Sequence, residues 1–337
     1  MSVDKLKSKI YKNDLFTNNE INIANYIYNI ENYDVFFSPI LKIHNINISK
    51  ISKKKYIKYN KYIQYNKDID YIVCDSLHID GENLLETIMR DNTRTNIRIM
   101  FETYISLLNS INILLTNSII HFNLNTNNII CQYITQNPII INFKYSINLE
   151  SISSNINLSI LKHYFYNYMP YYYTWPIEVH VICFILHNCD LHETSVLTDK
   201  DIITISNDYV NSISIFNIGE NIFNDIFKNN YLNQCIDTLQ EYIHTFNDIY
   251  ILLSNLLLTY TTWDNYAISI TYLYILNTIN ESTKSILDKQ CYCEIPSAFY
   301  NILIKNISPN FKNRLTINET INAYNRLFNE TENVIDD

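Results

Sequence analysis

Polar residues interrupt an apolar stretch at residues 119–143, which read IIHFNLNTNNIICQYITQNPIIINF. His121 and Asn123 come first, Asn128 follows, and Asn142 comes after two β-branched runs. An asparagine amide cannot take up a proton as a catalytic carboxylate does. It also offers Mg²⁺ only a neutral oxygen, whereas this cation prefers carboxylates and water. The segment therefore offers amides where acid–base or Mg²⁺ chemistry would use carboxylates.

A turn sequence, Thr135-Gln136-Asn137-Pro138, separates the two β-branched runs. The runs are Ile129–Tyr133 before it and Ile139–Phe143 after it. Apolar, β-branched runs on either side of a short turn predict a β-hairpin. The hairpin therefore lies between the loop that contains Asn128 and the segment that begins at Asn142.

Together these features resemble the catalytic core of a protein kinase, in which a His-x-Asp loop ends in Asn and a hairpin leads to Asp-Phe-Gly. In this resemblance Asn123 stands at the position of the catalytic aspartate, and Asn128 at that of the metal-binding asparagine. Asn142-Phe143-Lys144 stands in place of Asp-Phe-Gly. Phosphoryl transfer rests mainly on positioning and on metal ions that neutralise phosphate charge. The loss of both carboxylates therefore argues against efficient catalysis.

Three later segments resemble landmarks of the kinase helical lobe. Trp175-Pro176-Ile177-Glu178 is similar to the Ala-Pro-Glu end of the activation segment. Trp263-Asp264-Asn265-Tyr266-Ala267 is similar to the start of the long central helix. Arg314-Leu315-Thr316 is similar to the segment that carries a late, buried arginine.

These landmarks imply structural roles, which a catalytically inactive member of the family would keep. By the resemblance, Glu178 and Arg314 form one buried ion pair. Asp264 accepts backbone N–H groups of the loop that starts at His121. Phe122 replaces the arginine that often binds activation-loop phosphates, so control by that kind of phosphorylation is not expected.

The resemblance also places the nucleotide-binding side of the molecule. Tyr71-Ile72-Val73-Cys74-Asp75 resembles the fifth strand and hinge, and Asp80-Gly81-Glu82-Asn83-Leu84 resembles the segment that leads into the next helix. It implies that hinge backbone from Cys74 to Ser76 contacts an adenine ring. It further implies a ribose contact from Glu82.

Charged residues for the nucleotide phosphates are expected near the small lobe. Glu20 fits the glutamate of helix C, which pairs with a strand lysine in kinases. Lys9 is the first choice for that lysine, with Lys7 and Lys12 as alternatives. Lys144 could contact phosphates and replace a missing metal charge, but a lysine that points to solvent is the alternative.

The whole chain contains two glycines, Gly81 and Gly219. A phosphate-binding loop needs glycines where the backbone approaches phosphate without a Cβ atom. A Gly-rich loop is therefore excluded, and the first strands of the small lobe are expected to be shortened or missing. ATP is the one cofactor to consider, and we expect it to bind weakly, with weak or no Mg²⁺.

The resemblance covers about residues 18–330 and implies a two-lobed α+β fold. It places a reduced, β-rich N-lobe at 1–75 and a larger helical C-lobe at 76–330, with an insertion near 196–232. Residues 331–337 form an acidic tail that is expected to fray. The chain is similar in particular to kinase-like proteins of large DNA viruses, which implies the host-cell cytoplasm or the virion as its location.

Hydrophobic periodicity gives a coarse map of the same elements. Residues 18–31 have helical spacing, and residues 45–74 alternate in a way that favours strands. Residues 84–115 read as two helices with a break near Asp91-Asn92-Thr93. The apolar face of the second helix is formed by Met100, Tyr104, Leu107, Ile111 and Leu114.

Composition excludes several other classes of protein. The chain has 337 residues, 47% of them hydrophobic, with 29 Tyr and 15 Phe, which argues against intrinsic disorder. Its net charge of −9 argues against general nucleic-acid binding. No uninterrupted apolar run approaches the length of a membrane span, and the N-terminus lacks the apolar region of a signal peptide. Seven scattered cysteines indicate reduced thiols in a cytosolic compartment.

Three weaker patterns have ordinary explanations that we prefer. The basic and aromatic run at residues 53–62 could bind single-stranded nucleic acid, but a solvated hairpin with lysines along its edge is the simpler reading. A set of histidines and a cysteine could bind zinc, but its spacing matches no firm pattern. Its members are His180, His187, Cys189 and His192. Cys291 and Cys293 lack a second pair of ligands.

Three hypotheses for function remain. The first is a catalytically impaired, kinase-like protein that binds a protein partner and retains weak nucleotide binding. The second is a weak or atypical Ser/Thr kinase that uses Asn142 and Asn128 for metal. The third is a helical interaction protein unrelated to kinases. The sequence identifies neither the partner nor the pathway.

Overall fold

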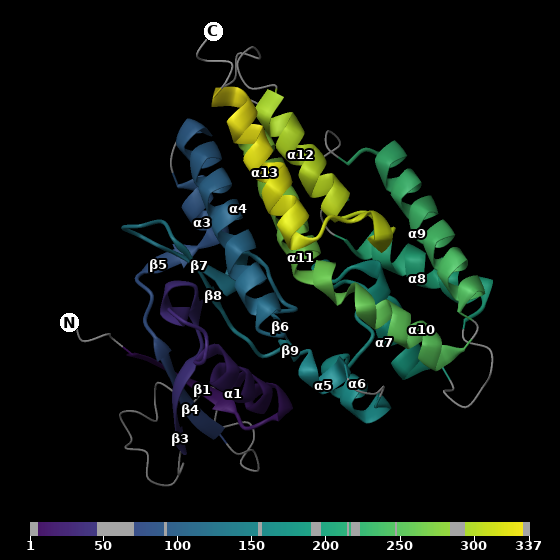
Figure 1. The fold of residues 1–337 in the computed structure, drawn as a ribbon, viewed down its shortest axis with the longest axis horizontal. Helices are drawn as coiled ribbons and strands as arrows, with labels where there is room; N and C mark the ends of the chain where they lie inside the picture. The colour runs from purple at the N-terminus through teal and green to yellow at the C-terminus, as the bar shows by residue number, and fades with distance from the viewer. Residues whose placement is uncertain are drawn as a thin grey trace.

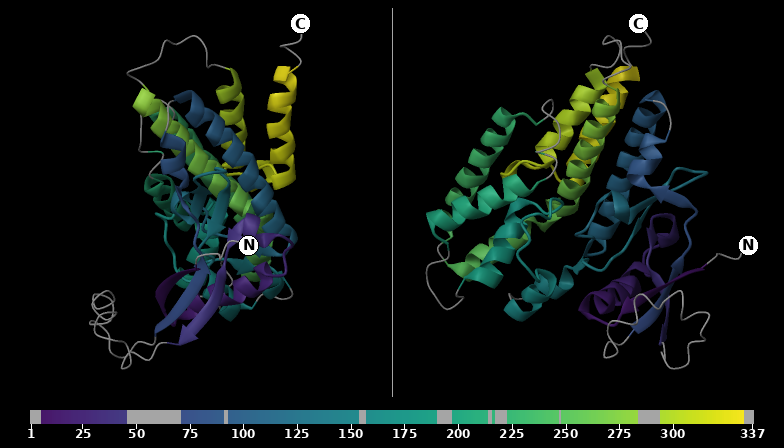
Figure 2. Two further views of the ribbon diagram at one scale, coloured as in Figure 1. Left: turned by 90° about the vertical axis from the view of Figure 1, so that its left-hand side faces the viewer. Right: turned by 180° about the vertical axis from the view of Figure 1, so that it is seen from behind.

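The computed structural model describes residues 6–45, 71–90, 93–153, 157–189, 197–213, 216, 223–246, 248–283 and 294–332. These residues form a small lobe of sheet and helix and a larger lobe that is mainly helical (Figure 1). Figure 2 shows from two further sides that the small lobe packs at one end of the helical lobe.

The small lobe combines an antiparallel sheet of strand order β1-β4-β3 with one helix. Its elements are β1 (Leu6–Lys12), α1 (Leu15–Ile27), β3 (Ile40–Asn45) and β4 (Tyr71–Leu77). The register sets Lys9 opposite Cys74 on the central strand. Asp14 caps α1 by accepting the Thr17 N–H at 2.9 Å, which satisfies one of the free donors at the helix start.

A second sheet links the lobes. It consists of β2 (Phe37–Ser38), β8 (Pro138–Ile141), β7 (Ile129–Gln132) and β5 (Gly81–Asn83), in that order. β2 runs parallel to β8, whereas β7 pairs antiparallel with both β8 and β5. A strand from the N-terminal part of the chain is thus hydrogen-bonded to the hairpin of the larger lobe. The two lobes are connected by this pairing as well as by the chain itself.

Gly81 in β5 is required by close packing of this sheet. A Cβ atom at this position would lie 2.1 Å from the carbonyl oxygen of Cys131 on β7. A side chain here would force the strands apart, so the glycine permits a close backbone approach. This glycine therefore serves strand pairing.

The larger lobe is built from helices around a buried core. Its helices are α3 (Leu84–Met89), α4 (Thr93–Thr116), α5 (Glu150–Ser153), α6 (Leu158–Tyr164), α7 (Ile177–Asn188), α8 (Asp199–Ser212), α9 (Asp225–Thr245), α10 (Ile249–Leu257), α11 (Trp263–Thr283), α12 (Glu294–Asn306) and α13 (Ile317–Glu332). Short elements complete it: η1 (Tyr33–Val35) near the small lobe, β6 (Ile119–Ile120) paired with β9 (Ile147–Asn148), η3 (Thr126–Asn128), η5 (Leu258–Thr262) and η6 (Phe311–Asn313).

Helix α11 lies at the centre of this lobe. Its apolar residues are buried on all sides, which is typical of a helix surrounded by protein. It packs against both α4 and α12. The predicted apolar face of α4, from Met100 to Leu114, is buried against these neighbours.

The structure confirms several elements expected from periodicity and changes others. The expected helix at 18–31 is α1, which begins and ends slightly earlier, and the two helices at 84–115 are α3 and α4. Of the strands expected in 45–74, β4 begins at Tyr71, and residues 46–70 lie outside the described residues.

Residues 196–232 were expected to be an insertion. Their described part forms α8 and the first turns of α9, and it is built into the core. Tyr209 on α8 is fully buried, and its hydroxyl lies 2.5 Å from that of Tyr266 on α11. This segment is therefore part of the packing around the central helix and contributes to the core of the lobe.

Candidate functional site

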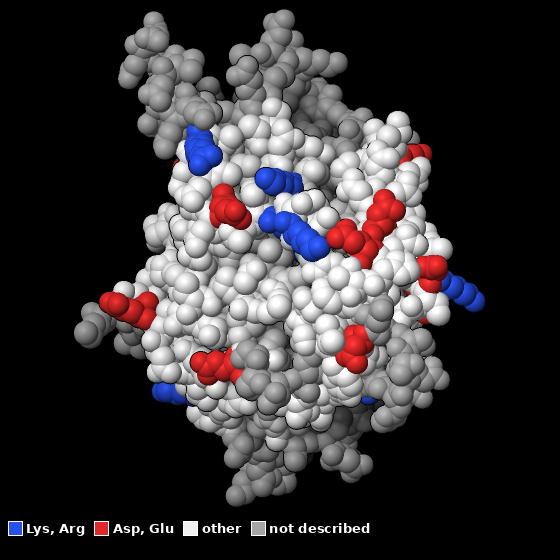
Figure 3. Space-filling view, turned by 45° about the vertical axis from the view of Figure 1, so that its right-hand side comes forward, with Lys and Arg blue, Asp and Glu red and all other residues white. Residues whose placement is uncertain are grey.

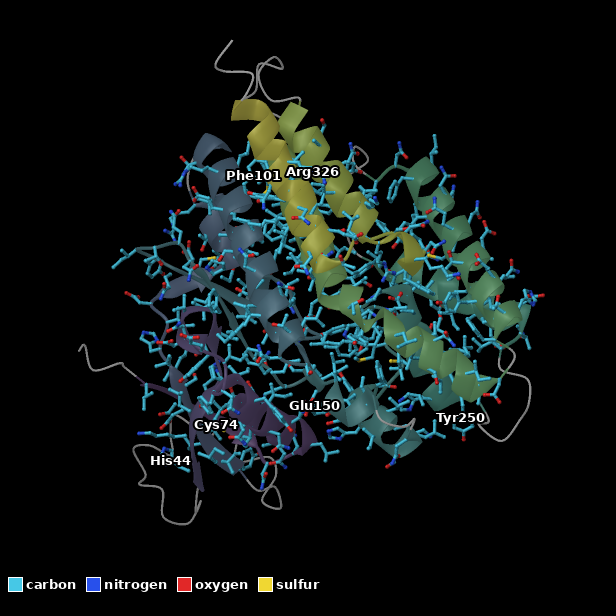
Figure 4. All side chains as sticks on the ribbon, viewed as in Figure 1. His44, Cys74, Phe101, Glu150, Tyr250 and Arg326 are labelled. Atoms are coloured by element: carbon cyan, nitrogen blue, oxygen red, sulfur yellow. The ribbon has the colours of Figure 1, made fainter. Side chains whose placement is uncertain are left out.

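A cleft of about 420 Å³ lies between the small lobe and the hairpin β7–β8. It is lined on one side by β1, α1 and β4, and on the other by the segments that end in Asn128 and Asn142. Of the sequence-predicted site residues, seven line it: Lys9, Glu20, Cys74, Ser76, Asn128, Asn142 and Lys144. Figure 4 shows Cys74 among the strands of the small lobe, close to α1. The fold thus brings together residues from both lobes.

Three lysines give the cleft a positive lining. Lys9 and Lys7 come from β1, and Lys144 comes from the segment after β8. The Lys144 ammonium lies 4.0 Å from the centre of the Tyr11 ring, a cation–π contact between the lobes. Burial lowers the pKa of Lys9, and the neighbouring cation of Lys7 lowers it further. Lys144 therefore points into the cleft and not into open solvent.

Glu20 sits at the back of the cleft on α1 and is almost fully buried. One carboxylate oxygen accepts the Phe143 N–H at 3.2 Å, whereas Oε2 has no hydrogen-bond partner. Burial raises the pKa of Glu20, and Lys144 and Lys9 oppose that shift. Both cations act on Glu20 only through space, and neither Lys9 nor Lys144 forms an ion pair with this carboxylate, so the expected strand lysine–glutamate pair is not closed.

Asn19, which the sequence did not single out, fastens α1 to the segment after Phe143. Its amide donates to the carbonyl oxygens of Lys144 and Ser146, each at 2.9 Å. Asn19 is itself buried. Helix α1 is therefore held against the Asn142-Phe143-Lys144 segment by three hydrogen bonds when the one to Glu20 is included.

Glu82, the expected ribose contact, lies outside the set of residues that line the cleft. Its carboxylate forms an ion pair with Arg90 at the end of α3. β5 pairs Glu82 with Cys131 on β7 and directs its side chain toward α3. Strand pairing places this carboxylate beside Arg90, and the expected ribose contact stays a prediction.

The three asparagines at the catalytic positions form a hydrogen-bonded chain of amides. Asn142 Nδ2 donates to Asn128 Oδ1 at 2.9 Å. Asn128 Nδ2 donates to the carbonyl oxygen of Asn123 at 2.8 Å. The oxygen of Asn128 that could face a metal ion is thus engaged by an amide hydrogen. We call these three residues the amide chain.

The amide chain does not fit a resident Mg²⁺ ion. It offers no carboxylate, and Mg²⁺ binds proteins mainly through carboxylates and retained waters. Among the described residues, no group of three or more His, Cys, Asp and Glu side chains gathers as a metal site. The backbone of Asn142 has φ 67°, a left-handed conformation that asparagine tolerates well.

Asn123 is buried, is not among the residues that line the cleft, and receives hydrogen bonds from two side chains. Asn125 Nδ2 donates to its Oδ1 at 3.0 Å. The hydroxyl of Tyr172, from the segment before α7, donates to the same oxygen. Tyr172 could not be singled out from the sequence, because nothing distinguishes it from the other tyrosines of this chain.

Strained backbone at Phe122 is held by three contacts. Phe122 has φ 64°, which is unfavourable for a bulky residue. The carboxylate of Asp264 accepts the N–H groups of His121 at 2.7 Å and of Phe122 at 2.9 Å. Trp175 Nε1 donates to the Phe122 carbonyl oxygen at 2.8 Å. The surrounding structure therefore determines the conformation of this loop.

The Phe122 ring joins an aromatic cluster. It stacks on Trp175 and contacts Phe165 and Trp263. A position that often carries a phosphate-binding arginine is therefore part of the core.

His121 is fully buried and neutral. Its Nε2 donates to the Ile141 carbonyl oxygen at 3.0 Å, and its Nδ1 accepts the Asn123 N–H at 3.3 Å. Burial lowers the pKa of His121 to about 4. Burial also raises the pKa of Asp264 to about 6, against the effect of the two N–H donors. These groups position the loop and do not face the cleft.

Glu178 and Arg314 form a bidentate ion pair, as the resemblance implies. The two N–O distances are 2.5 and 2.9 Å, and the side chains are 0% and 1% exposed. Arg314 Nε also donates to the Ser308 carbonyl oxygen at 2.7 Å. Residues 136 positions apart in the chain are thus joined in the core. We call Glu178, Arg314 and Asp264, with the backbone that Asp264 holds, the anchor network.

The weaker patterns in the sequence gain no support as sites. His187 Nε2 donates to the Phe165 carbonyl oxygen at 2.6 Å, and His180 is buried between Trp175 and Tyr209. His192, the run at 53–62, Cys291 and Cys293 lie outside the described residues. On the face drawn in Figure 3, described lysines and arginines are few and interspersed with acidic side chains.

One helix in the described part of the chain, over residues 95–116, is long and apolar enough to cross a membrane. It belongs to α4, which packs against α11, α13 and α3 in the larger lobe. Its hydrophobicity is therefore explained by its place in the core.

Comparison with known proteins gives a structural likeness only. No protein-family model matches this chain, and no curated protein matches it. Among solved structures, the chain is similar to the kinase PK-1 of the Cydia pomonella granulovirus. The two share 11% sequence identity with a TM-score of 0.45, over 94% of this chain and 84% of that one.

The chain has a two-lobed, protein-kinase-like fold, with a small sheet-containing lobe and a larger helical lobe. We base this assignment on the anchor network and the order of the elements, which agree with the landmarks in the sequence. The hypothesis of an unrelated helical protein is therefore set aside.

Proposed function

We propose that this protein is a catalytically impaired kinase-like protein, a pseudokinase, that acts by binding a protein partner. The observation that carries the proposal is the hydrogen bond from Asn142 Nδ2 to Asn128 Oδ1. It joins the two positions that would hold metal ions in an active kinase. Phosphoryl transfer needs those ions to neutralise developing charge, and a pair of neutral amides does not supply their ligands.

The cleft supports weak nucleotide binding without metal. Its lysines, Lys9 and Lys144 foremost, can face phosphate charge directly. Cys74 and Ser76 of β4 also line the cleft, but the backbone of this central strand is paired with β1 and β3, so a nucleotide would contact their side chains. Glu20 lines the same cleft and offsets part of their charge through space, without an ion pair to either lysine. A Gly-rich loop cannot cover the phosphates, because the chain has two glycines and Gly81 serves strand pairing. We therefore expect low affinity for ATP.

An assay of phosphoryl transfer tests the first part of the proposal. The purified chain is incubated with ATP, Mg²⁺ or Mn²⁺ and generic Ser/Thr substrates. We expect no turnover above background, because Asn123 cannot act as a base and the amide chain binds no metal. Turnover within about tenfold of the kinase range of roughly 1–100 s⁻¹ would refute it.

A thermal-shift experiment tests the second part. Unfolding is followed with increasing ATP in EDTA and again with excess Mg²⁺. A ligand that binds only the folded state stabilises it by about 2.7 kcal/mol at 100 times its Kd. We expect a small stabilisation that is equal in both buffers and is lost in the Lys144→Met variant. A large stabilisation that requires Mg²⁺ would mean that a working metal site survives.

A weak or atypical Ser/Thr kinase is the second candidate function. It is favoured by the arrangement of Lys9 and Glu20 on β1 and α1, which line the same cleft. If the protein is such an enzyme, any transfer measured above should disappear in the Lys9→Met variant. Transfer that persists in Lys9→Met would point to a contaminating kinase.

A further inference from the structure

The segment Phe165–Trp175, which we call the strap, crosses the loop that carries Asn123. It connects α6 to α7 without regular secondary structure. Its ends, Phe165 and Trp175, are buried, whereas Tyr171 in its middle is 63% exposed. Met169 within the strap is buried as well, so local opening of the strap without unfolding of the lobe would begin at its exposed residues.

Both ends of the strap are fastened to buried groups. The Phe165 carbonyl oxygen accepts from His187 Nε2, and its ring packs on Phe122. Trp175 Nε1 donates to the Phe122 carbonyl oxygen, next to Asn123 in the chain. The strap is therefore held beside this loop from both directions.

The middle of the strap is held to the loop by a hydroxyl group. The Tyr172 hydroxyl donates to Asn123 Oδ1, which also accepts from Asn125 Nδ2. An amide oxygen has two lone pairs, so the acceptor capacity of Asn123 is filled. Burial raises the pKa of Tyr172, so the phenol keeps its proton and remains a donor at physiological pH.

We propose that the strap closes the side of the site where a protein substrate would enter. The Tyr172 hydroxyl is hydrogen-bonded to Asn123 and occupies the place of the substrate hydroxyl that would receive the phosphate. The inference rests on the proposed function, which assigns Asn123 to the position that receives the hydroxyl of a substrate. The chain thus fills the substrate-hydroxyl position with its own tyrosine. This contact excludes a serine or threonine side chain independently of the lost carboxylates.

Aromatic packing holds the strap in the position that allows this contact. Tyr172 packs its ring against Trp175, with centroids 4.6 Å apart, and lies near Tyr145. Tyr166 packs on Tyr145 and on Phe16 of α1. The strap therefore contacts both lobes, and its opening would loosen the aromatic contact with α1.

Hydrogen–deuterium exchange on the full chain tests the proposal without nucleotide. Tyr172→Phe removes the hydroxyl and keeps the ring, and Tyr171→Phe is the matched control at an exposed neighbour. Loss of one hydrogen bond should speed exchange of the strap and of residues 121–128 by about 2- to 10-fold. The control should leave exchange unchanged, and α4 should be unaffected in both variants. Equal strap exchange in the two variants would overturn the proposal.

Variants of Asn123, which accepts the hydrogen bond from Tyr172, give an independent check. Asn123→Asp keeps an oxygen for Tyr172 and should leave strap exchange slow. Asn123→Leu removes the hydrogen-bond acceptor and should raise the exchange rate of the strap as Tyr172→Phe does. The two changes should not add when combined, because they break the same bond. Additive effects would overturn the proposal, whereas failure of the proposed function would appear only as phosphoryl transfer or Mg²⁺-dependent stabilisation.

Discussion

The anchor network and the amide chain meet at the loop from His121 to Asn128 and differ in charge: Asp264 of the first holds its backbone, and two asparagines of the second lie within it. The anchor network keeps three ionisable side chains, Glu178, Arg314 and Asp264, and all three are buried. The amide chain has a neutral asparagine at each position where chemistry would need a carboxylate or a metal ligand. Both regions correspond to kinase landmarks in the sequence.

The difference in charge separates two requirements on the same fold, stability of the core and ligand contacts in the cleft. A buried charge that loses its partner costs several kcal/mol, so the anchor network cannot change one residue at a time. A residue that faces the cleft has no such constraint once turnover is no longer needed. Hydrogen bonds among amides then stabilise the loop in place of ligand contacts. Under the proposed function, the fold can therefore persist while the chemistry is lost.

Breaking the ion pair should produce the largest effect. Glu178→Ala and Arg314→Ala should each lower the free energy of unfolding by about 3–5 kcal/mol, because each strands a buried charge. The double variant should cost much less than the sum of the two single changes. Chemical denaturation measures all three. Arg98→Ala removes an exposed pair with Glu102 and should cost about 0.3–0.5 kcal/mol or less.

Two results would contradict the comparison. Additive losses for Glu178 and Arg314 would mean that the pair does not act as a unit. A loss below about 1 kcal/mol for either single variant would place the pair with ordinary surface contacts.

Acidification should also affect the buried region. Burial lowers the pKa of His180 on α7 to about 4, from an ordinary value of 6.5. Between these values the unfolded chain binds a proton that the folded chain excludes, so stability falls as pH falls from about 6.5 toward 4. From pH 7 to 4.5 this histidine should remove about 2–3 kcal/mol. Urea denaturation of His180→Phe should show a smaller loss than the original chain over that range.

The comparison of slopes isolates this histidine. Asp264 changes in the opposite direction, because its raised pKa adds stability as pH falls through about 6. Its contribution is the same in both proteins and cancels in the difference. Identical pH slopes for the chain and for His180→Phe would show that this histidine does not resist protonation in the fold.

A change in the amide chain should have the smallest effect and depend on metal. In Asn142→Asp a carboxylate faces Asn128 Oδ1, so two acceptors oppose each other. We expect a loss of about 1 kcal/mol in EDTA, which Mg²⁺ partly restores by bridging the oxygens. The unchanged chain should show no response to Mg²⁺. Thermal unfolding in both buffers makes the comparison, and a Mg²⁺ response in the unchanged chain would mean that neutral amides suffice for metal.

Local patterns in the sequence predicted much of the fold and part of the site. Periodicity located α1, α3 and α4, and the turn Thr135–Pro138 located the hairpin. The motif resemblance located Glu178, Asp264 and Arg314. These predictions succeed because element type follows from neighbouring residues and because a buried charge permits few substitutions.

The sequence by itself determined the absence of carboxylates at Asn123 and Asn142 and the absence of a Gly-rich loop, since both follow from residue identity. Only the tertiary structure decided the partners of the remaining polar groups. It turned Glu82 to Arg90, joined Asn142 to Asn128 and brought the Tyr172 hydroxyl to Asn123. A polar side chain forms hydrogen bonds with the donors and acceptors that tertiary packing brings within about 3 Å of it. Such neighbours come from distant parts of the chain, so no local pattern of residues encodes them.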